Sequence, residues 1–138
     1  MSTDNKSLVR KWFDEVWNNG REAMIDELMA NHAVVRGLGE DLIGPAGFKP
    51  FHQAFRSAFP DIMVHLDQVI AEGDTVAARW TATGTHRGDG LGFAATGRPV
   101  QFSGMVFARI VDGKMVEGWN TMDQLGMMQQ LGIVDRPA

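Results

Sequence analysis

The sequence predicts an α+β fold in which helices cover one face of a curved antiparallel sheet. Apolar residues recur with a helical period over much of the first 60 residues. From residue 61 to residue 122 they alternate with polar residues, which is the period of half-buried strands. Helices that come before a run of consecutive strands are typical of α+β domains, because they pack together against one face of a single sheet.

Three helices are expected in the first part of the chain. The first covers residues 7–18, and six apolar side chains form its stripe: Leu8, Val9, Trp12, Phe13, Val16 and Trp17. Asn19 and Gly20 end it, because both residue types tolerate the left-handed backbone of a helix C-terminus. The second helix covers about residues 21–30. The third covers residues 47–59 and ends before Pro60.

Five strands and a last helix complete the expected order. The first strand, residues 31–35, lies between the second and third helices and is followed by a loop over residues 37–47. The other four are expected over residues 61–71, 75–86, 100–111 and 114–122. Asp112-Gly113 between two alternating segments is a strong signal for a two-residue hairpin turn. A short apolar-periodic helix over residues 124–131 ends the chain.

The alternation assigns side chains to the two faces of the sheet. In the strand over residues 75–86, the inward set is Val76, Ala78, Trp80, Ala82, Gly84 and His86. A two-residue turn at Asp112-Gly113 places Trp119, Thr121 and Asp123 on the face of Phe102, Gly104, Val106 and Ile110. We therefore expect Trp119 and Asp123 to point into the core. His52 and His65 are expected to be exposed.

Composition limits the classes of partner. The chain has 138 residues, with 13 Lys+Arg against 17 Asp+Glu and a net charge of −4, so no nucleic-acid partner is expected. It has no cysteine for disulfide or thiol chemistry, and no apolar run of the roughly 18 residues that a membrane span needs. The polar start from Met1 does not resemble a signal peptide. We expect a single cytoplasmic domain over residues 1–138.

Several segments together carry a family resemblance. They are residues 9–18, 58–61, 72–76, 84–86 and 111–119, and the tail from Asp123 to Gly132. In this order the chain resembles the SnoaL-like polyketide cyclases, or ester cyclases, of the NTF2-like superfamily. The resemblance implies a cone, with a curved, mostly antiparallel sheet wrapped by N-terminal helices around a deep apolar pocket. It also implies a homodimer or higher homo-oligomer formed through the outer sheet face.

The resemblance further implies cofactor-free acid/base chemistry, an intramolecular aldol closure or a related reaction of an acidic C–H bond. In characterised cyclases an aspartate near the end of the last strand is the general acid/base, and Asp123 occupies the matching position here. Such a base needs a water-poor pocket that raises its pKa toward the working pH. Asp123 also directly precedes an apolar-periodic segment, so the alternative is a helix N-cap. The two roles are compatible.

Other residues are expected around a small apolar or aromatic ligand. His86 ends its strand on the Trp80 face, where it could be a second acid/base; the alternative is a surface histidine. The expected pocket residues are Phe13, His32, Trp80, Phe102, Val106 and Trp119. For the tryptophans the alternative is ordinary core packing, and for His32 a surface loop.

Phe13 stands where relatives often place a tyrosine, and the chain has no tyrosine. From the resemblance, the expected function is a SnoaL-like cyclase-type enzyme; the missing tyrosine motivates the first alternative below. The alternatives are a non-catalytic small-molecule-binding protein, or an isomerase or hydrolase on the same fold. No cofactor is expected, and the spacing of the four histidines gives little support for a metal site.

Overall fold

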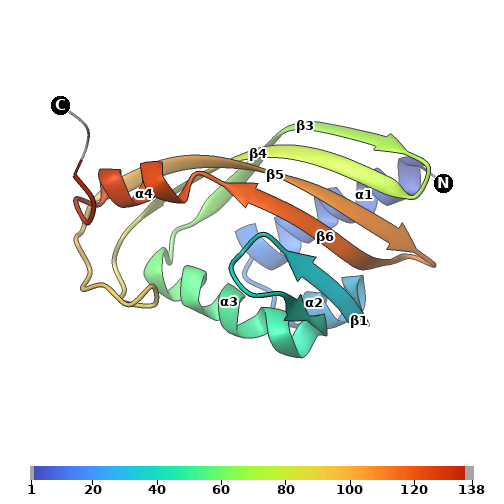
Figure 1. The fold of residues 1–138 in the computed structure, drawn as a ribbon, viewed down its shortest axis with the longest axis horizontal. Helices are drawn as coiled ribbons and strands as arrows, with labels where there is room; N and C mark the ends of the chain where they lie inside the picture. Colours follow the sequence, from blue (N-terminus) through green and yellow to red (C-terminus); the bar gives the residue numbers. More distant parts are fainter. Residues whose placement is uncertain (1, 136–138) are drawn as a thin grey trace.

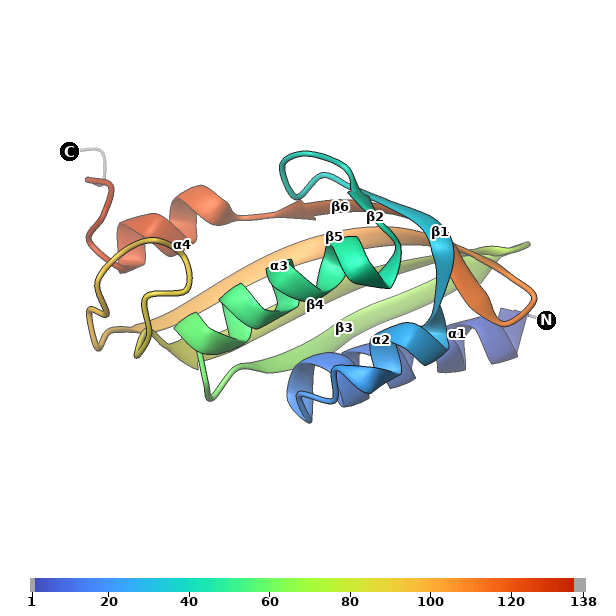
Figure 2. The same cartoon turned by 90° about the horizontal axis from the view of Figure 1, so that it is seen from below.

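The protein folds as one bent sheet with helices packed against its concave side (Figure 1, Figure 2). A computed structural model describes residues 2–135. In chain order the elements are α1 (Ser2–Lys11), the π-helix η1 (Trp12–Asn18), α2 (Ala23–Leu28), β1 (Met29–Arg36), β2 (Leu42–Ile43), α3 (Gly44–Ala58), β3 (Met63–Glu72), β4 (Thr75–Thr85), β5 (Pro99–Val111), β6 (Lys114–Met122) and α4 (Gln124–Gln130). Met1 and residues 136–138 of the expected domain lie outside the described residues.

The six strands form one sheet in the order β2-β1-β6-β5-β4-β3. The β1–β6 pair is parallel and the other neighbouring pairs are antiparallel, which confirms the expected mostly antiparallel sheet. Helix α1 packs against β3 and β4, whereas α3 packs against β1. In Figure 2 both helices lie on the same side of the sheet, so the buried side chains collect between the helices and the sheet.

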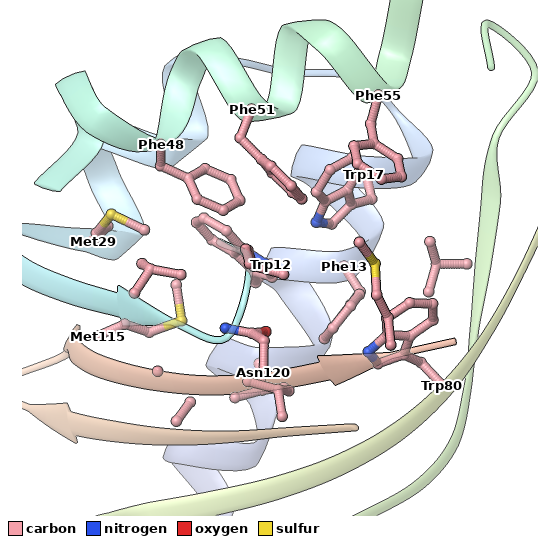
Figure 3. A pocket seen from close by; sticks show the side chains of 18 of the residues that line it. Trp12, Phe13, Trp17, Met29, Phe48, Phe51, Phe55, Trp80, Met115 and Asn120 are labelled. Carbon is pink, nitrogen blue, oxygen red and sulfur yellow. The ribbon is translucent and has the colours of Figure 1, made fainter. Parts of the chain in front are cut away.

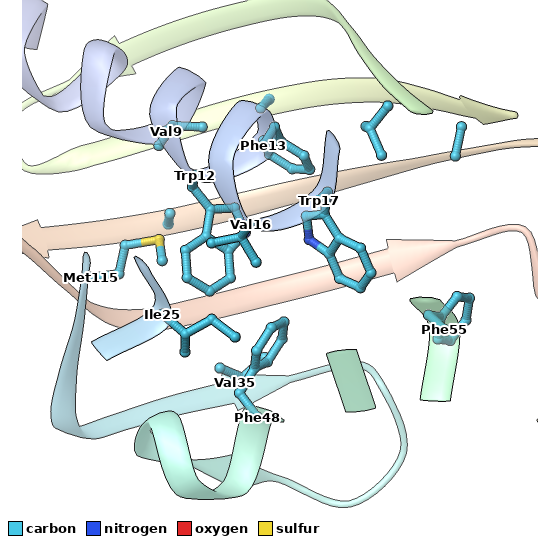
Figure 4. Close-up of a cluster of buried hydrophobic side chains, with 14 of the residues drawn as sticks. Val9, Trp12, Phe13, Val16, Trp17, Ile25, Val35, Phe48, Phe55 and Met115 are labelled. Atoms are coloured by element: carbon cyan, nitrogen blue, oxygen red, sulfur yellow. The ribbon is translucent and has the colours of Figure 1, made fainter. Parts of the chain in front are cut away.

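The apolar stripe of the first helix is buried as the sequence predicts (Figure 4). Val9, Trp12, Phe13, Val16 and Trp17 are each at most 9% exposed. The helix begins at Ser2 instead of residue 7, because the polar segment before Ser7 carries no apolar period to reveal it. From Trp12 onward the helix widens into the π-helix η1, a form often found at functional sites.

Helix α3 and strand β3 fix the end of η1. A helix end leaves backbone carbonyls without partners inside the helix. Here His52 Nε2 donates to the Val16 carbonyl at 2.7 Å, and Arg56 Nη1 donates to the Trp17 carbonyl at 2.6 Å. Asn18 Nδ2 donates to the Val64 carbonyl at 3.0 Å, and Asn18 Oδ1 accepts the Val64 N–H at 2.6 Å. The prediction that His52 is exposed is therefore wrong; it is 3% exposed because it fixes this helix end.

A β-bulge in β6 changes the faces expected for its side chains. The turn at Asp112-Gly113 has two residues as predicted, both with positive φ (53° and 77°). The pairs are then Ile110↔Met115 and Arg109↔Glu117, so Val116 is an extra residue in β6. One extra residue reverses the alternation beyond it. Trp119 and Thr121 consequently point outward, and the prediction that they face the core with Phe102 and Val106 is wrong.

The segment expected as a loop over residues 37–47 contains β2 and the first turn of α3. Strand β2 has two residues, which is too short to show an alternating pattern. Helix α3 begins at Gly44, and Pro45 lies in its first turn, where the missing N–H of proline removes no helical hydrogen bond. The helix ends at Ala58, shortly before Pro60, as expected.

Gly37 allows the chain after β1 to pass directly against the backbone of β6. Its φ is +92°, and a Cβ added there would collide with the Asn120 carbonyl oxygen. We therefore expect Gly37→Ala to lower the free energy of unfolding by about 2–4 kcal/mol, because left-handed strain adds to a backbone clash. Urea denaturation measures this change.

Gly39→Ala is the matched control. Gly39 also has positive φ (+108°), but a Cβ there meets nothing within 4 Å, so only the strain of about 1–2 kcal/mol applies. Equal losses for the two variants would contradict a tight β1–β6 contact at Gly37.

Candidate functional site

A cavity of about 100 Å³ lies between the concave face of the sheet and the helices η1 and α3 (Figure 3). We call it the aromatic cavity, because most of its bulky wall residues carry rings. These are Trp12, Phe13 and Trp17 from η1, Phe48, Phe51 and Phe55 from α3, and Trp80 and Phe102 from the sheet. The rings contact one another, with centroids 5.2 Å apart for Trp12 and Phe48 and 6.5 Å for Phe13 and Trp80. Such a wall suits a flat apolar ligand.

Asn120 supplies a polar side chain to the wall. Glu117 also borders the cavity, but it pairs with Arg109 and shares the outward face of Trp119, so its carboxylate lies on the outer side of the sheet. The Asn120 amide points into the cavity in Figure 3, and its Nδ2 donates to the Arg36 carbonyl at 3.1 Å. Glu117 is committed to two arginines: Arg36 Nη1 donates to it at 2.7 Å and Arg109 Nε at 2.9 Å. These hydrogen bonds hold the pKa of the Glu117 carboxyl below its usual range, so it remains an ionised acceptor rather than a proton donor.

The structure brings four of the expected pocket residues to the cavity wall: Phe13, Trp80, Phe102 and Val106. It places the other two elsewhere. Trp119 is 43% exposed on the outer face of the sheet, with the Arg36 guanidinium 5.5 Å from its ring centroid, because the bulge at Val116 turns it outward. His32 is exposed on β1 and is not part of the wall, since it alternates with the buried Ala33.

His86 is buried, but it does not line the aromatic cavity. Its ring packs against Phe59 with centroids 5.6 Å apart. Its Nδ1 accepts the Thr96 N–H at 3.1 Å. Its backbone N–H donates to the Arg98 carbonyl, and its carbonyl accepts the Gly97 N–H. His86 therefore anchors the loop over residues 87–98, and neither a place at the pocket nor the alternative of a surface histidine is correct.

Asp123 is the N-cap of α4. Its Oδ1 accepts the Gly126 N–H at 2.9 Å, which confirms the capping alternative. The side chain is exposed and is not part of the cavity wall, so the expectation of a carboxylate inside a water-poor pocket is wrong. The physical reason is again the bulge, together with the end of β6 at Met122.

The comparisons with known proteins cover nearly the whole chain. The sequence model of the SnoaL-like polyketide cyclases matches residues 7–131. The chain belongs to this family. The aklanonic acid methyl ester cyclases DauD of Streptomyces sp. (strain C5) and DnrD of Streptomyces peucetius are each 32% identical over 130 residues. These alignments cover 91% of this chain and 80% and 88% of the relatives.

The structural comparison agrees with this SnoaL-like assignment. The crystal structure of AclR from Streptomyces galilaeus matches with a TM-score of 0.88 at 26% identity, over 100% of this chain and 87% of that chain. A ketosteroid isomerase-like structure shares the architecture at lower identity, which confirms the expected NTF2-like fold. Each helix within residues 2–135 is too short or too polar to cross a membrane.

The aromatic cavity is also lined by residues that the sequence analysis did not assign to a ligand site. Phe48, Phe51 and Phe55 are spaced as one face of α3, a signal that identifies a buried face but does not separate core from pocket. Asn120 was hidden by the bulge, because strict alternation places it on the outer face. Among the described residues no group of three His, Asp or Glu side chains is arranged to hold a metal ion.

His52 is a buried titratable side chain that packs against the wall of the aromatic cavity. Its ring packs edge-on against Trp17, a cavity residue, with centroids 5.0 Å apart. Burial lowers the pKa of His52, and the nearby Arg56 lowers it further, against the opposing effects of the Val16 carbonyl and Glu22. Its Nδ1 is buried without a hydrogen-bond partner, so a proton there would have no acceptor.

We expect the free energy of unfolding to fall as pH drops below about 6.5, the ordinary pKa of histidine. The folded state binds fewer protons than the unfolded state, so the stabilisation is present above that pH and is lost below it. The slope for one proton cannot exceed about 1.4 kcal/mol per pH unit. Urea denaturation of the wild type and His52→Gln between pH 8 and pH 5 isolates the effect, and parallel pH profiles would contradict it.

Proposed function

We propose that this SnoaL-like protein is a cyclase-type enzyme that binds a small apolar, polyketide-like ester in the aromatic cavity. The observation that carries the proposal is a ring-lined cavity with one amide whose oxygen is free to accept a hydrogen bond, in a chain whose relatives are named as methyl ester cyclases. Ring surfaces such as those of Phe13 and Trp80 can pack against the part of the ester that enters the cavity, fix its position and remove water from it.

The proposed reaction is an intramolecular aldol closure. A base removes a proton from a carbon between two carbonyl groups, and the resulting carbanion attacks another carbonyl carbon of the same molecule. One carbon–carbon bond forms, and the new alkoxide takes up a proton. The substrate's own carbonyls delocalise the negative charge, so the protein must supply position and proton transfer.

For proton transfer we propose Asp123, acting on the part of the ester that extends out of the cavity, because its exposed side chain lies outside the wall. Asp123 directly follows Met122, a residue of the cavity wall, and the family resemblance gives an acid/base role to this position. A second candidate function is ligand binding without turnover. It is favoured by one specific observation: among the described wall residues, the polar side-chain groups available to a ligand are indole N–H groups and the Asn120 amide, because the Glu117 carboxylate is turned to the outer face and bound by two arginines.

Replacing Asp123 with Asn separates these functions. Asn is as good an N-cap as Asp, so the fold should be unchanged. We expect cyclisation of a polyketide methyl ester to slow about 100-fold or more, since general acid/base catalysis contributes about 10²–10⁴. Steady-state turnover measured by chromatography of the cyclised product tests this.

Asp135→Asn, at an exposed position outside the cavity wall, is the control and should keep full turnover. Unchanged turnover in the Asp123 variant would remove Asp123 from the mechanism. Binding of the ester by the wild type without any cyclisation would favour the binding protein.

We also propose that two copies associate through the outer face of the sheet. Phe107 lies opposite Trp119 on β6 and Ala77 on β4, and Ala77 lies opposite Ile70 on β3. Phe107 and Ile70 are 54% and 56% exposed and Trp119 is 43% exposed, so an apolar row crosses four strands. Contiguous exposed apolar rows of this kind are typical of association surfaces.

Phe107→Asp should therefore shift the protein toward monomer, because a charge would be buried without a partner at the centre of the interface. We expect the dissociation constant of the dimer to rise at least about 10-fold, as measured by sedimentation velocity at micromolar protein concentration. Phe93→Asp, at an exposed ring in the loop over residues 87–98, is the control. A wild type that sediments as a monomer would contradict this interface.

A further inference from the structure

The Asn120 amide has a defined orientation in the aromatic cavity. Its Nδ2 donates to the Arg36 carbonyl at 3.1 Å, and a backbone carbonyl can only accept. The nitrogen and oxygen of the amide are therefore not interchangeable. Within the described residues this bond leaves Oδ1 free, and the amide points into the cavity in Figure 3. Gly118, which has no side chain, lies beside the amide on the same strand face.

The surroundings make this oxygen the acceptor that a ligand would use. Apart from Glu117, whose carboxylate two arginines hold on the outer face, the neighbouring wall consists of aromatic rings, aliphatic side chains and methionines. An acceptor in such a cavity that lacks a donor loses the hydrogen bond it would make with water. A ligand that brings a hydroxyl group restores that bond, whereas one that brings a carbonyl or a methyl group does not.

The size of the cavity limits the buried part of the ligand. Pockets for drug-sized molecules are roughly 300–1,000 Å³, whereas an apolar cavity of about 150 Å³ accepts a benzene ring. The aromatic cavity, at about 100 Å³, is of the second kind. One ring can lie between the surfaces of η1 and the sheet, and any further part of a ligand would extend toward the cavity opening.

We propose that Asn120 is a specificity-determining residue that selects ligands whose buried part is a single ring, or a ring-sized enol, with a hydroxyl that donates to its Oδ1. The proposal rests on the proposed function only in that the cavity holds a small ligand; it does not depend on turnover. A purely structural role for Asn120, joining β6 to the end of β1 through Arg36, would affect stability without affecting ligand preference.

The test compares phenol with toluene, which have nearly the same size and shape but differ in the hydroxyl donor. Three tryptophans line the cavity and Trp119 lies on the outer face, so the indole ¹H–¹⁵N NMR signals report where the probes bind. We expect Trp12, Trp17 and Trp80 to shift with both probes and Trp119 to remain unchanged. Titration of these shifts gives a dissociation constant for each probe.

The decisive quantity is the ratio of the toluene to the phenol dissociation constant. In Asn120→Leu, which keeps a similar shape without an acceptor, we expect this ratio to fall about 3- to 10-fold, as the loss of one hydrogen bond predicts. Thr121→Val is the control, because Thr121 is the next residue of β6 but points outward. It should keep the wild-type ratio.

A second measurement uses the wild-type protein and therefore does not require Asn120→Leu to fold. The side-chain ¹³C carbonyl signal of Asn120 should shift with phenol beyond any shift caused by toluene, since only phenol donates to Oδ1. Equal ratios in the wild type and Asn120→Leu, or equal carbonyl shifts with both probes, would overturn the proposal and leave cavity binding intact. Absence of any shift at the three cavity tryptophans would overturn both. Loss of cyclisation alone would remove the cyclase proposal but not this one.

Discussion

The extra residue at Val116 determines what the aromatic cavity contains. Because side chains alternate along a strand, one inserted residue sends every later side chain of β6 to the opposite face. Beyond the bulge, Asn120 and Met122 join the cavity wall, while Trp119 joins the outer face. The same shift leaves Asp123 at the strand exit with an exposed side chain, where it caps α4. The chemistry inside the cavity and the apolar row outside it therefore share one cause.

The second constraint is the fixed end of the N-terminal helix. Carbonyl groups at the end of η1 would lack partners inside the helix, and side chains of α3 supply them. His52 and Arg56 are one helical turn apart, so both reach consecutive carbonyls, those of Val16 and Trp17. The cost is a buried imidazole with a lowered pKa. The gain is a rigid position for Trp17, and rigid walls are what an apolar ligand site requires.

Family membership and site geometry answer different questions about this protein. The family model and the methyl ester cyclases that resemble the chain identify the fold and the class of chemistry to test. They do not specify the ligand, because one fold carries many functions. In this chain the cavity is small, lined with rings and provided with one oriented amide. Those features favour a compact ligand with few polar groups, whether the protein cyclises that ligand or only binds it.

Periodicity in the sequence was sufficient for the helices, the β3, β4 and β5 strands and the Asp112-Gly113 turn, because burial of one face imposes a regular spacing. It therefore also located Phe13, Trp80, Phe102 and Val106. It missed β2, the early start of α3 and the burial of His52, which depend on contacts between distant segments. It also gave the wrong faces to Trp119 and Asp123.

The sequence by itself thus determined the order of elements and the apolar character of the interior. Both follow from local spacing and composition. Only the tertiary structure decided which polar group faces the ligand space. Whether β6 carries an extra residue is set by how Met115 and Val116, both buried, pack against the rest of the core. A single inserted residue leaves no mark on local composition, yet it exchanges the two faces of the strand that ends at the site.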